Sequence, residues 1–336
     1  MMEYRGRYKM FDVSKIKTYP LETRPSEVTI SDLIDPERIL NEPLKYYSSD
    51  LEKIARAILD AHKDNKPVVI MSGAHVVKNG LSPIYNEFIK QGIVDHIGVN
   101  GAFTIHDFEL TFAGKTSESI PDALSKGLFG FAEETDRYLN DMLNYANKLK
   151  IGYGEALGRL ISGEPFPEHI NFKYPDISVP YNAYKHGIPF TVHVGVGTDI
   201  FHMHPNFDGE SVGGCSGRDF LIFAQKISEM TEGGVCLLIG SAVIGVEVYL
   251  KAFSMAANIG KIPNDVVMAD LDLRKANIND AAEDRKDKPT YYFRDIKSIV
   301  VRIPKAFNGR GYYIQGDQRD TLPALYKLVM ENIKMS

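Results

Sequence analysis

The sequence contains no tryptophan and only two cysteines among its 336 residues. Cys215 and Cys236 do not form a C-x-x-C pair, which argues against a disulfide scaffold and predicts a reducing, cytoplasmic location. No apolar run is long enough to cross a bilayer, and the charged first residues lack the apolar core of a signal peptide. We therefore expect no membrane partner.

The sequence also lacks a stripe of basic residues. Its formal net charge is −5, and acidic and basic residues are dispersed along the chain, so nucleic acid is not an expected partner. Hydrophobic residues make up 44% of the sequence, enough for a large α/β core.

Apolar runs bounded by glycine or proline alternate with segments of helical periodicity. This alternation predicts βαβ units and a mainly parallel sheet. We expect a doubly wound, Rossmann-like α/β domain over 48–336, with a helical insertion at about 117–163, preceded by an extended N-terminal arm over 1–47. The expected strands are 66–73, 93–99, 188–197, 235–240, 265–273, 298–303 and 311–317.

Ligands of such sheets bind beyond the carboxyl ends of the strands. The loops expected there are rich in glycine and small residues, which favours a nucleotide-like ligand because its backbone contacts need close approach. These loops are 72–80, 98–107, 194–205, 240–247, 269–272 and 315–320. None contains a full G-x-G-x-x-G or Walker A pattern, although "GVGTDI" (195–200) begins like the first.

Two other patterns leave alternatives open. His202 and His204 alternate along an extended segment near Asp199, which would suit a metal-dependent hydrolase. Lys297 and Lys305 flank an expected late strand, and a buried lysine can form an imine, although such lysines are more often solvated surface residues.

Taken together, the strand-end loops resemble those of the deoxyhypusine synthase family. The resemblance runs from about 35 to 333 and rests on the order of several segments. These are "KPVVIMSGAHVVKNGLSPIYNEFIKQGIVDHIGVNGAFTIHDFE", "IPFTVHVGVGTDIFHMH", "GGVCLLIGSAVI" and "GYYIQGDQRDTLPALY".

The resemblance implies an NAD-dependent transfer. Family members oxidise spermidine with NAD, release diaminopropane, carry the aminobutyl group on an enzyme lysine and pass it to a lysine of a translation factor. Some relatives use small amines as acceptors and form homospermidine-like products. The family also implies a homotetramer with active sites at dimer interfaces.

Carried over position by position, the resemblance assigns Asp199 to a polyamine ammonium and four loops to the cofactor NAD. The cofactor residues are Ala74, His75, Val76, Val77 and Lys78; Val99, Asn100 and Gly101; Gly240 and Ser241; and Asp317 and Gln318. Gly98 and Gly101 are expected to let the backbone approach the dinucleotide.

The sequence departs from the family at its catalytic positions. The family's acidic pair falls on Ile105 and His106, with Asp107 and Glu109 close by, and the Trp-Gly-Lys segment is missing. The predicted catalytic residues are therefore His106, Asp107 and Lys297, with Asp199 and Glu109 binding substrate and no metal. A family member that has lost the chemistry and acts as a binding protein is the further alternative.

Overall fold

A six-stranded parallel sheet forms the centre of the protein, in the order β5-β3-β2-β6-β7-β8. The computed structural model describes residues 4–166, 168–283 and 285–335. The strands are β2 (Val68–Ser72), β3 (His96–Asn100), β5 (Phe190–His193), β6 (Gly234–Ile239), β7 (Val266–Asp272) and β8 (Arg310–Gln315). The strand order reverses between β2 and β6, so the expected doubly wound fold is confirmed and its switch point lies there.

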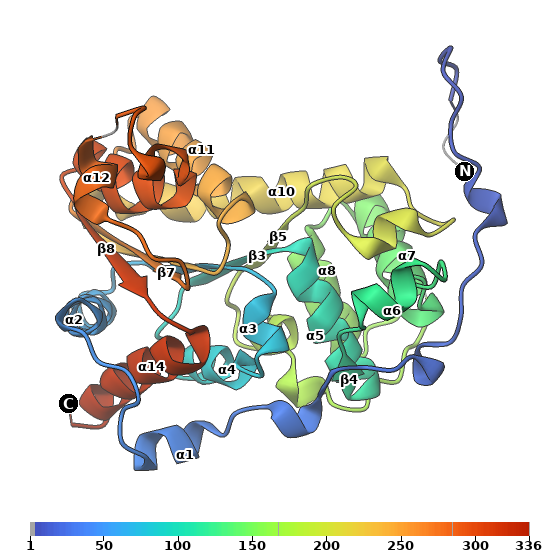
Figure 1. Cartoon of the computed structure of the whole chain (residues 1–336), viewed down its shortest axis with the longest axis horizontal. Helices are drawn as coiled ribbons and strands as arrows, with labels where there is room; N and C mark the ends of the chain where they lie inside the picture. Colours follow the sequence, from blue (N-terminus) through green and yellow to red (C-terminus); the bar gives the residue numbers. More distant parts are fainter. Residues whose placement is uncertain (1–3, 167, 284, 336) are drawn as a thin grey trace.

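Helices cover both faces of this sheet (Figure 1). One face packs against α2 (Ser49–Lys63), α4 (Ser82–Lys90) and α14 (Gln318–Met335). The other packs against α10 (Gly209–Ser228) and α11 (Ile244–Asn258). Helix α2 forms because its apolar residues recur on one side, where Leu51, Ile54 and Ile58 are buried, and because the Ser48 hydroxyl caps it by accepting a hydrogen bond from Leu51 N.

The helical insertion follows β3. It contains α5 (Gly101–Ala113), β4 (Lys115–Thr116), α6 (Ile120–Leu124), α7 (Glu133–Leu149) and α8 (Tyr153–Ile161), before α9 (Val179–Lys185) leads into β5. The arm adds β1 (Val28–Thr29), which pairs antiparallel with β4, and α1 (Pro36–Asn41). The arm therefore lies against the insertion along part of its length (Figure 1).

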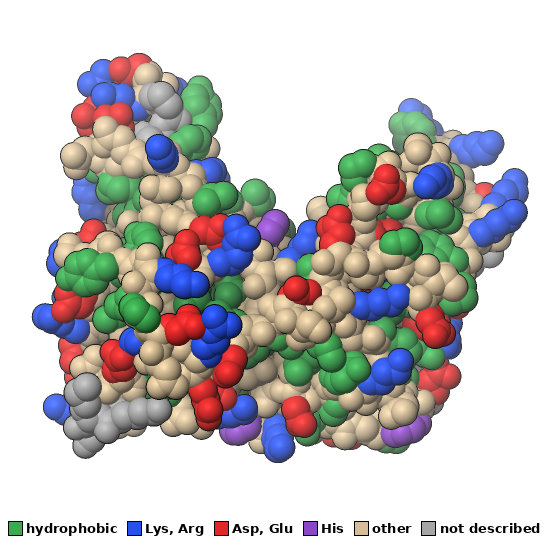
Figure 2. Space-filling view, turned by 60° about the horizontal axis from the view of Figure 1, so that its bottom comes forward, with side chains coloured by type: hydrophobic (Ala, Val, Ile, Leu, Met, Phe, Trp, Pro, Cys, Tyr) green, Lys and Arg blue, Asp and Glu red, His purple; other side chains and the backbone are tan. Residues whose placement is uncertain are grey.

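Short helical segments complete the chain. They are η1 (Val13–Lys15), η2 (Leu21–Thr23), η3 (Ile30–Asp32), α3 (His75–Lys78), η4 (Pro175–Ile177), η5 (Ile200–Met203), η6 (Met230–Glu232), α12 (Ile278–Glu283), η7 (Pro289–Tyr292), the π-helix η8 (Ile296–Arg302) and α13 (Ile303–Ala306). Within the described residues, no helix combines the length and the apolar character that a membrane span requires. On the face shown in Figure 2, acidic and basic side chains are interspersed, and the surface is hollowed between two projecting parts.

Three sequence-based assignments were wrong, and one of them is the expected loop 269–272, which lies entirely within β7. The run 298–303 is not a strand but forms most of η8 and the start of α13, because β8 already occupies the edge of β7 and the run packs beneath both strands. A short buried apolar run has the same pattern in a helix and in a strand. The expected loop 98–107 is also largely regular: β3 ends at Asn100, whose side chain caps α5 by accepting from Phe103 N (3.1 Å).

Candidate active site

Three chain segments meet at the carboxyl ends of β2 and β6. A Cβ on Gly73, after β2, would lie 2.1 Å from the carbonyl oxygen of Gly240, and a Cβ on Gly240 would lie 2.2 Å from Gln318 Nε2 at the start of α14. Gly240 has φ +59°, a conformation that favours glycine. The predicted cofactor loops 72–80 and 240–247 and the start of α14 therefore come together at the switch point.

The turn between β6 and α11 carries a signal that the sequence reasoning missed. "GSAVIG" (240–245) is the dinucleotide-binding pattern G-x-G-x-x-G with alanine at the second glycine. Gly240 makes the tight turn, and a Cβ on Gly245 would lie 2.5 Å from Met71 Cγ, so Gly245 permits close packing of helix on strand. Both outer glycines thus have the roles that the pattern requires, and the turn fits a pyrophosphate at the N-terminus of α11.

The other predicted cofactor residues fall into two groups. The first group stabilises the fold: Asn100 caps α5, and Ser241 Oγ accepts a hydrogen bond from Gly245 N. Ala74 stands directly before α3, and the buried core contains Val76, Val77 and Val99. Gly98 lies in β3, where its missing side chain makes room for Met71 and Phe223, so it does not face a ligand as expected. His75 is exposed, and Asp317 pairs with Arg319 (2.6 Å).

A cavity of about 200 Å³ lies among segments that follow β2, β3 and β5, and several of its lining side chains are charged. It brings together four of the predicted site residues, which come from α3, α5 and the loop before η5: Lys78, His106, Glu109 and Asp199. The remaining lining residues are Arg24, Ala102, Ile105, Ser117, Glu118, Ile120, Phe129, Thr198 and Ile200.

The Glu109 carboxylate is fully hydrogen-bonded to protein groups. Its carboxylate accepts two hydrogen bonds from Arg24 (2.7 and 2.6 Å), one from Thr116 and one from Thr135. Burial opposes its ionisation, but the Arg24 guanidinium holds the pKa of Glu109 below its ordinary value. A carboxylate has about four acceptor positions, so these four donors leave Glu109 none for a substrate. Glu109 instead links the N-terminal arm, through Arg24, to α5.

His106 lies beside this anchor with one ring nitrogen assigned. Thr116 Oγ1 donates its single proton to Glu109 (2.6 Å), so the hydrogen bond between His106 Nδ1 and Thr116 Oγ1 (2.8 Å) requires Nδ1–H as donor. Nε2 is then the acceptor nitrogen of His106. Burial lowers the pKa of His106 to about 4, so the ring is neutral near pH 7.

Two further carboxyl groups, Asp199 and Glu118, line the cavity, and a third, Asp136, interacts electrostatically with Glu109 and Glu118. Asp199 is 8% exposed, and its Oδ2, which lies against Gly101, has no hydrogen-bond partner among the described residues. Burial raises the pKa of Asp199 to about 6, raises that of Glu118, and raises that of Asp136 on α7 to about 9. A cation bound beside Asp199 and Glu118 would stabilise their ionised forms.

Asp107 does not belong to this cavity. It accepts hydrogen bonds from Ser178 Oγ (2.6 Å) and Val179 N (2.9 Å) and so binds the start of α9. Lys297 is also outside the cavity lining: it lies buried in η8, with its Nζ 3.6 Å from the centre of the Tyr291 ring. Lys305 is exposed on α13.

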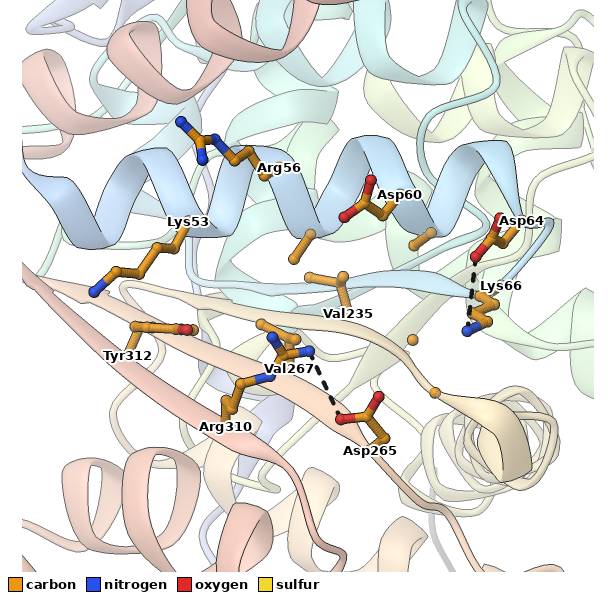
Figure 3. Close-up of a pocket in the computed structure, with 14 residues that line it drawn as sticks. Lys53, Arg56, Asp60, Asp64, Lys66, Val235, Asp265, Val267, Arg310 and Tyr312 are labelled. Carbon is orange, nitrogen blue, oxygen red and sulfur yellow. Dashed lines mark ion pairs between the residues drawn. The ribbon is translucent and has the colours of Figure 1, made fainter.

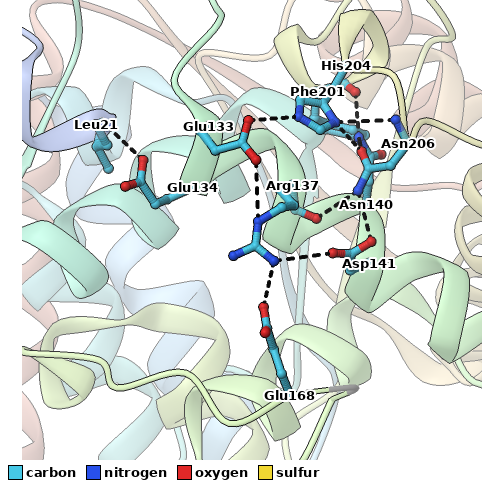
Figure 4. Close-up of polar contacts among 10 residues, drawn as sticks. All are labelled: Leu21, Glu133, Glu134, Arg137, Asn140, Asp141, Glu168, Phe201, His204 and Asn206. Atoms are coloured by element: carbon cyan, nitrogen blue, oxygen red, sulfur yellow. Dashed lines mark hydrogen bonds and ion pairs between the residues drawn. The ribbon is translucent and has the colours of Figure 1, made fainter. Parts of the chain in front are cut away.

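The segment that carries Asp199 is tied to α7 by polar contacts (Figure 4). Asn140 Nδ2 donates to the carbonyl oxygen of Phe201 (2.8 Å), and His204 Nε2 lies 3.4 Å from Glu133. His202 Nδ1 instead accepts from the backbone of Gly197 (3.1 Å). The two histidines thus have separate partners, and the described part of the chain holds no cluster of three or more His, Cys, Asp or Glu residues suited to a metal ion.

Comparison with known proteins gives a likeness of fold. No protein-family model matches the chain. No curated protein sequence matches it either. Among solved structures, a candidate deoxyhypusine synthase from Entamoeba histolytica is 12% identical, with a TM-score of 0.50 over 94% of this chain and 97% of that one.

Two further solved structures have TM-scores below 0.5. A candidate LOR/SDH protein from Methanococcus maripaludis S2 is 13% identical, with a TM-score of 0.47 over 92% of this chain and 74% of that one. ArgZ, a cyanobacterial arginine dihydrolase, is 14% identical, with a TM-score of 0.47 over 84% of this chain. This chain spans about a third of the length of ArgZ, 32%. At these identities the shared feature is the Rossmann-like α/β fold.

Proposed function

We propose that the protein is an NAD-dependent transferase that moves an aminobutyl group from spermidine or a related polyamine to an acceptor amine. The observation that carries the proposal is the adjacency of two features at one edge of the sheet. A dinucleotide-type turn follows β6 at the switch point, and the segments after β3 and β5 line a cavity in which Asp199 Oδ2 has no hydrogen-bond partner among the described residues. The candidate deoxyhypusine synthase of similar fold supports the same reading.

The residues of the cavity suit an amine substrate. Asp199 would bind an ammonium group, because its Oδ2, which no described residue contacts by a hydrogen bond, can accept a charge-assisted one. His106, neutral and with Nε2 as its acceptor, would take the proton of the amine that is oxidised. Bound NAD would supply the hydride acceptor at this edge.

The transfer itself needs an enzyme amine. Oxidation of a spermidine carbon–nitrogen bond gives an imine, and attack by a lysine amine releases 1,3-diaminopropane while forming a new imine on the enzyme. The acceptor amine then displaces the lysine, and return of the hydride reduces the product imine. We assign the lysine role to Lys297 from the family resemblance, with Lys78 as the lysine that already lines the cavity.

Since Lys297 does not line the cavity of its own chain, the assignment also proposes a homotetramer in which a second copy completes each site. The acceptor is either a lysine of a translation factor or a small amine that yields a homospermidine-like product. Light scattering measures the assembly, and incubation with candidate acceptors distinguishes the products.

The direct test is incubation with NAD and spermidine, followed by mass spectrometry for 1,3-diaminopropane. We expect diaminopropane in wild-type reactions and its loss in His106→Phe, while Asp287→Ser, at an exposed ion pair far from the cavity lining, retains it. Absence of product with several polyamines and acceptors, in protein that binds NAD, would favour a non-catalytic binding protein.

A further inference from the structure

A cluster of acidic side chains stands at the carboxyl end of β7. Asp270 is 1% exposed, and Asp272 and Asp295 both pair with the guanidinium of Arg274. Tyr313 steadies the same arginine by donating its hydroxyl to the Arg274 carbonyl oxygen (2.5 Å). Neither the cavity described above nor the proposed transfer uses this cluster.

The position of this acidic cluster in the sheet relates it to the dinucleotide-type turn after β6. β6, the "GSAVIG" turn, α11 and β7 form one βαβ unit, and Asp272 is the last residue of the second strand. In dinucleotide-binding units with this turn, an acidic residue after the second strand accepts hydrogen bonds from the adenosine ribose, whereas an arginine there accommodates the 2′-phosphate of NADP. Both residue types, Asp272 and Arg274, are present here.

The geometry decides between them. Asp272 Oδ1 accepts from Arg274 N (2.7 Å) and Nε (3.0 Å), and Asp272 Oδ2 accepts from Arg274 Nη2 (3.0 Å). A carboxylate has about four acceptor positions, so Asp272, with its side chain 12% exposed, retains acceptor capacity on Oδ2. Arg274, in contrast, is shared by two carboxylates.

The charge balance points the same way. With Arg274 shared between Asp272 and Asp295, the two carboxylates and one guanidinium leave net negative charge where a phosphate would sit. A 2′-phosphate would add roughly −1.5 to −2 charges and would meet repulsion. The buried surroundings also hold acceptors without partners among the described residues, Asp270 Oδ2 and Gln318 Oε1, which suit ribose hydroxyl donors and not phosphate oxygens.

We propose that Asp272 accepts hydrogen bonds from the adenosine ribose of the dinucleotide and that Asp272 and Asp295, by neutralising Arg274, select NAD over NADP. The inference rests on the proposed NAD-dependent function but goes further. It names Asp272 as the residue that binds the ribose, and it predicts that NADP binds more weakly than NAD.

Titration of the full-length protein with NADH and with NADPH, followed by the fluorescence of the reduced nicotinamide, tests the proposal without any reaction. We expect wild-type protein to bind NADH at least about tenfold more tightly than NADPH. Asp272→Ser should weaken NADH binding about tenfold, as loss of a charge-assisted hydrogen bond does, and should improve NADPH binding by removing one of the two carboxylates that pair with Arg274. Arg274→Ala should instead weaken NADPH binding, because it leaves both carboxylates without a neutralising partner from Arg274.

Asp287→Ser is the matched control, because it removes an exposed aspartate that pairs with Arg285 in the same part of the chain. It should leave both affinities unchanged. Asp272→Asn keeps the size of the side chain, and its circular dichroism and melting temperature separate an effect on binding from a loss of fold.

The outcomes are distinguishable. NADPH preference in wild type that disappears in Arg274→Ala would overturn the inference, since Arg274 would then read the phosphate. NADH preference unchanged in folded Asp272→Ser and Asp272→Asn would overturn the role of Asp272 while leaving the proposed function standing. Failure of wild type to bind either dinucleotide would overturn the proposed NAD-dependent function and the inference with it.

Discussion

The two edges of the same sheet carry hollows of different character. The carboxyl edge holds the cavity of about 200 Å³ around His106 and Asp199, and the amino edge holds a larger one of about 350 Å³ between α2 and the starts of β6, β7 and β8 (Figure 3). Both are lined by acidic and basic side chains. Volume alone would favour the amino edge as the functional site.

The burial of the charged side chains favours the carboxyl edge instead. At the amino edge Arg310 and Asp265 are 3.7 Å apart with side chains 60% and 59% exposed, whereas Arg24 and Glu109 are 2.6 Å apart and 3% and 1% exposed. Exposed pairs are screened by water and contribute little. Buried charges with shifted pKa values need a compensating partner, and their concentration at the carboxyl edge is what marks it as the candidate site.

The largest expected effect concerns the proposed carrier lysine, Lys297, which lies outside both hollows of its own chain. Lys297→Ala should reduce diaminopropane release coupled to product formation by several orders of magnitude, because no covalent intermediate can form. Lys305→Ala, at an exposed lysine, should change little. Mass spectrometry of borohydride-treated protein locates the adduct.

Mixing inactive variants sharpens this result. If a second copy completes each site, co-expressed His106→Phe and Lys297→Ala chains should recover part of the activity. An adduct found on Lys78, with full activity in Lys297→Ala, would instead move the nucleophile to the lysine that lines the cavity of the same chain.

The second effect is on stability. Arg24→Ala should lower the free energy of unfolding by about 3–5 kcal/mol, because it strands a buried carboxylate. Arg310→Ala at the amino edge should cost about 0–1 kcal/mol, as exposed pairs do. Urea unfolding measures both.

A double variant distinguishes the stranded charge from lost packing. Arg24→Met combined with Glu109→Leu removes both charges and should recover most of the loss. If the double variant is as unstable as Arg24→Ala, the buried ion pair is not the source of the difference between the edges.

The third effect is on binding of the amine. Asp199→Asn should weaken spermidine binding about tenfold at pH 7.5, because it removes a charge-assisted hydrogen bond. Asp60→Asn at the amino edge should not change it. Isothermal titration calorimetry measures both affinities.

The pH dependence carries a definite sign. Burial raises the pKa of Asp199 to about 6, so acidification through that value neutralises the carboxylate and should weaken the binding of an ammonium ligand. Asp199→Asn should lose most of this dependence. A wild-type affinity that is flat from pH 7.5 to 5.5 would remove Asp199 from the ligand's contacts.

The same contrast explains what the sequence could predict. All six strands of the parallel sheet were predicted, because each is a short apolar run between turn residues, and the carboxyl edge followed from the fold class. Once 101–113 is recognised as a helix, the spacing of His106 and Glu109 puts both on one face and Asp107 elsewhere, which a loop assignment could not show.

What the sequence could not predict depends on contacts between distant segments. Arg24 is an ordinary arginine in an irregular arm, and only the fold places it against Glu109, 85 positions away. The prediction of a strand at 298–303 was wrong for a related reason, since only the position of β8 decides whether this run can join the sheet. The "GSAVIG" turn was readable in the sequence, but alanine at its second glycine concealed it.

The smallest effect compares two glycines. A Cβ on Gly101 would lie 2.1 Å from Asp199 Oδ2, whereas a Cβ on Gly217, inside α10, meets nothing within 4 Å. Gly217→Ala should therefore stabilise the protein by about 0.5–1 kcal/mol, the usual helix-propensity gain, with spermidine binding unchanged. Gly101→Ala should displace the Asp199 carboxylate and weaken that binding several-fold.

A double-mutant cycle identifies the cause. In an Asp199→Ala background the obstructing carboxylate is gone, so adding Gly101→Ala should have almost no further effect on stability or binding. If the two substitutions are additive, Gly101 is required for another reason, such as close approach of a ligand to the start of α5. The cycle thereby tests whether the glycine after β3 serves the acid of the cavity or the dinucleotide that the sequence alone suggested for it.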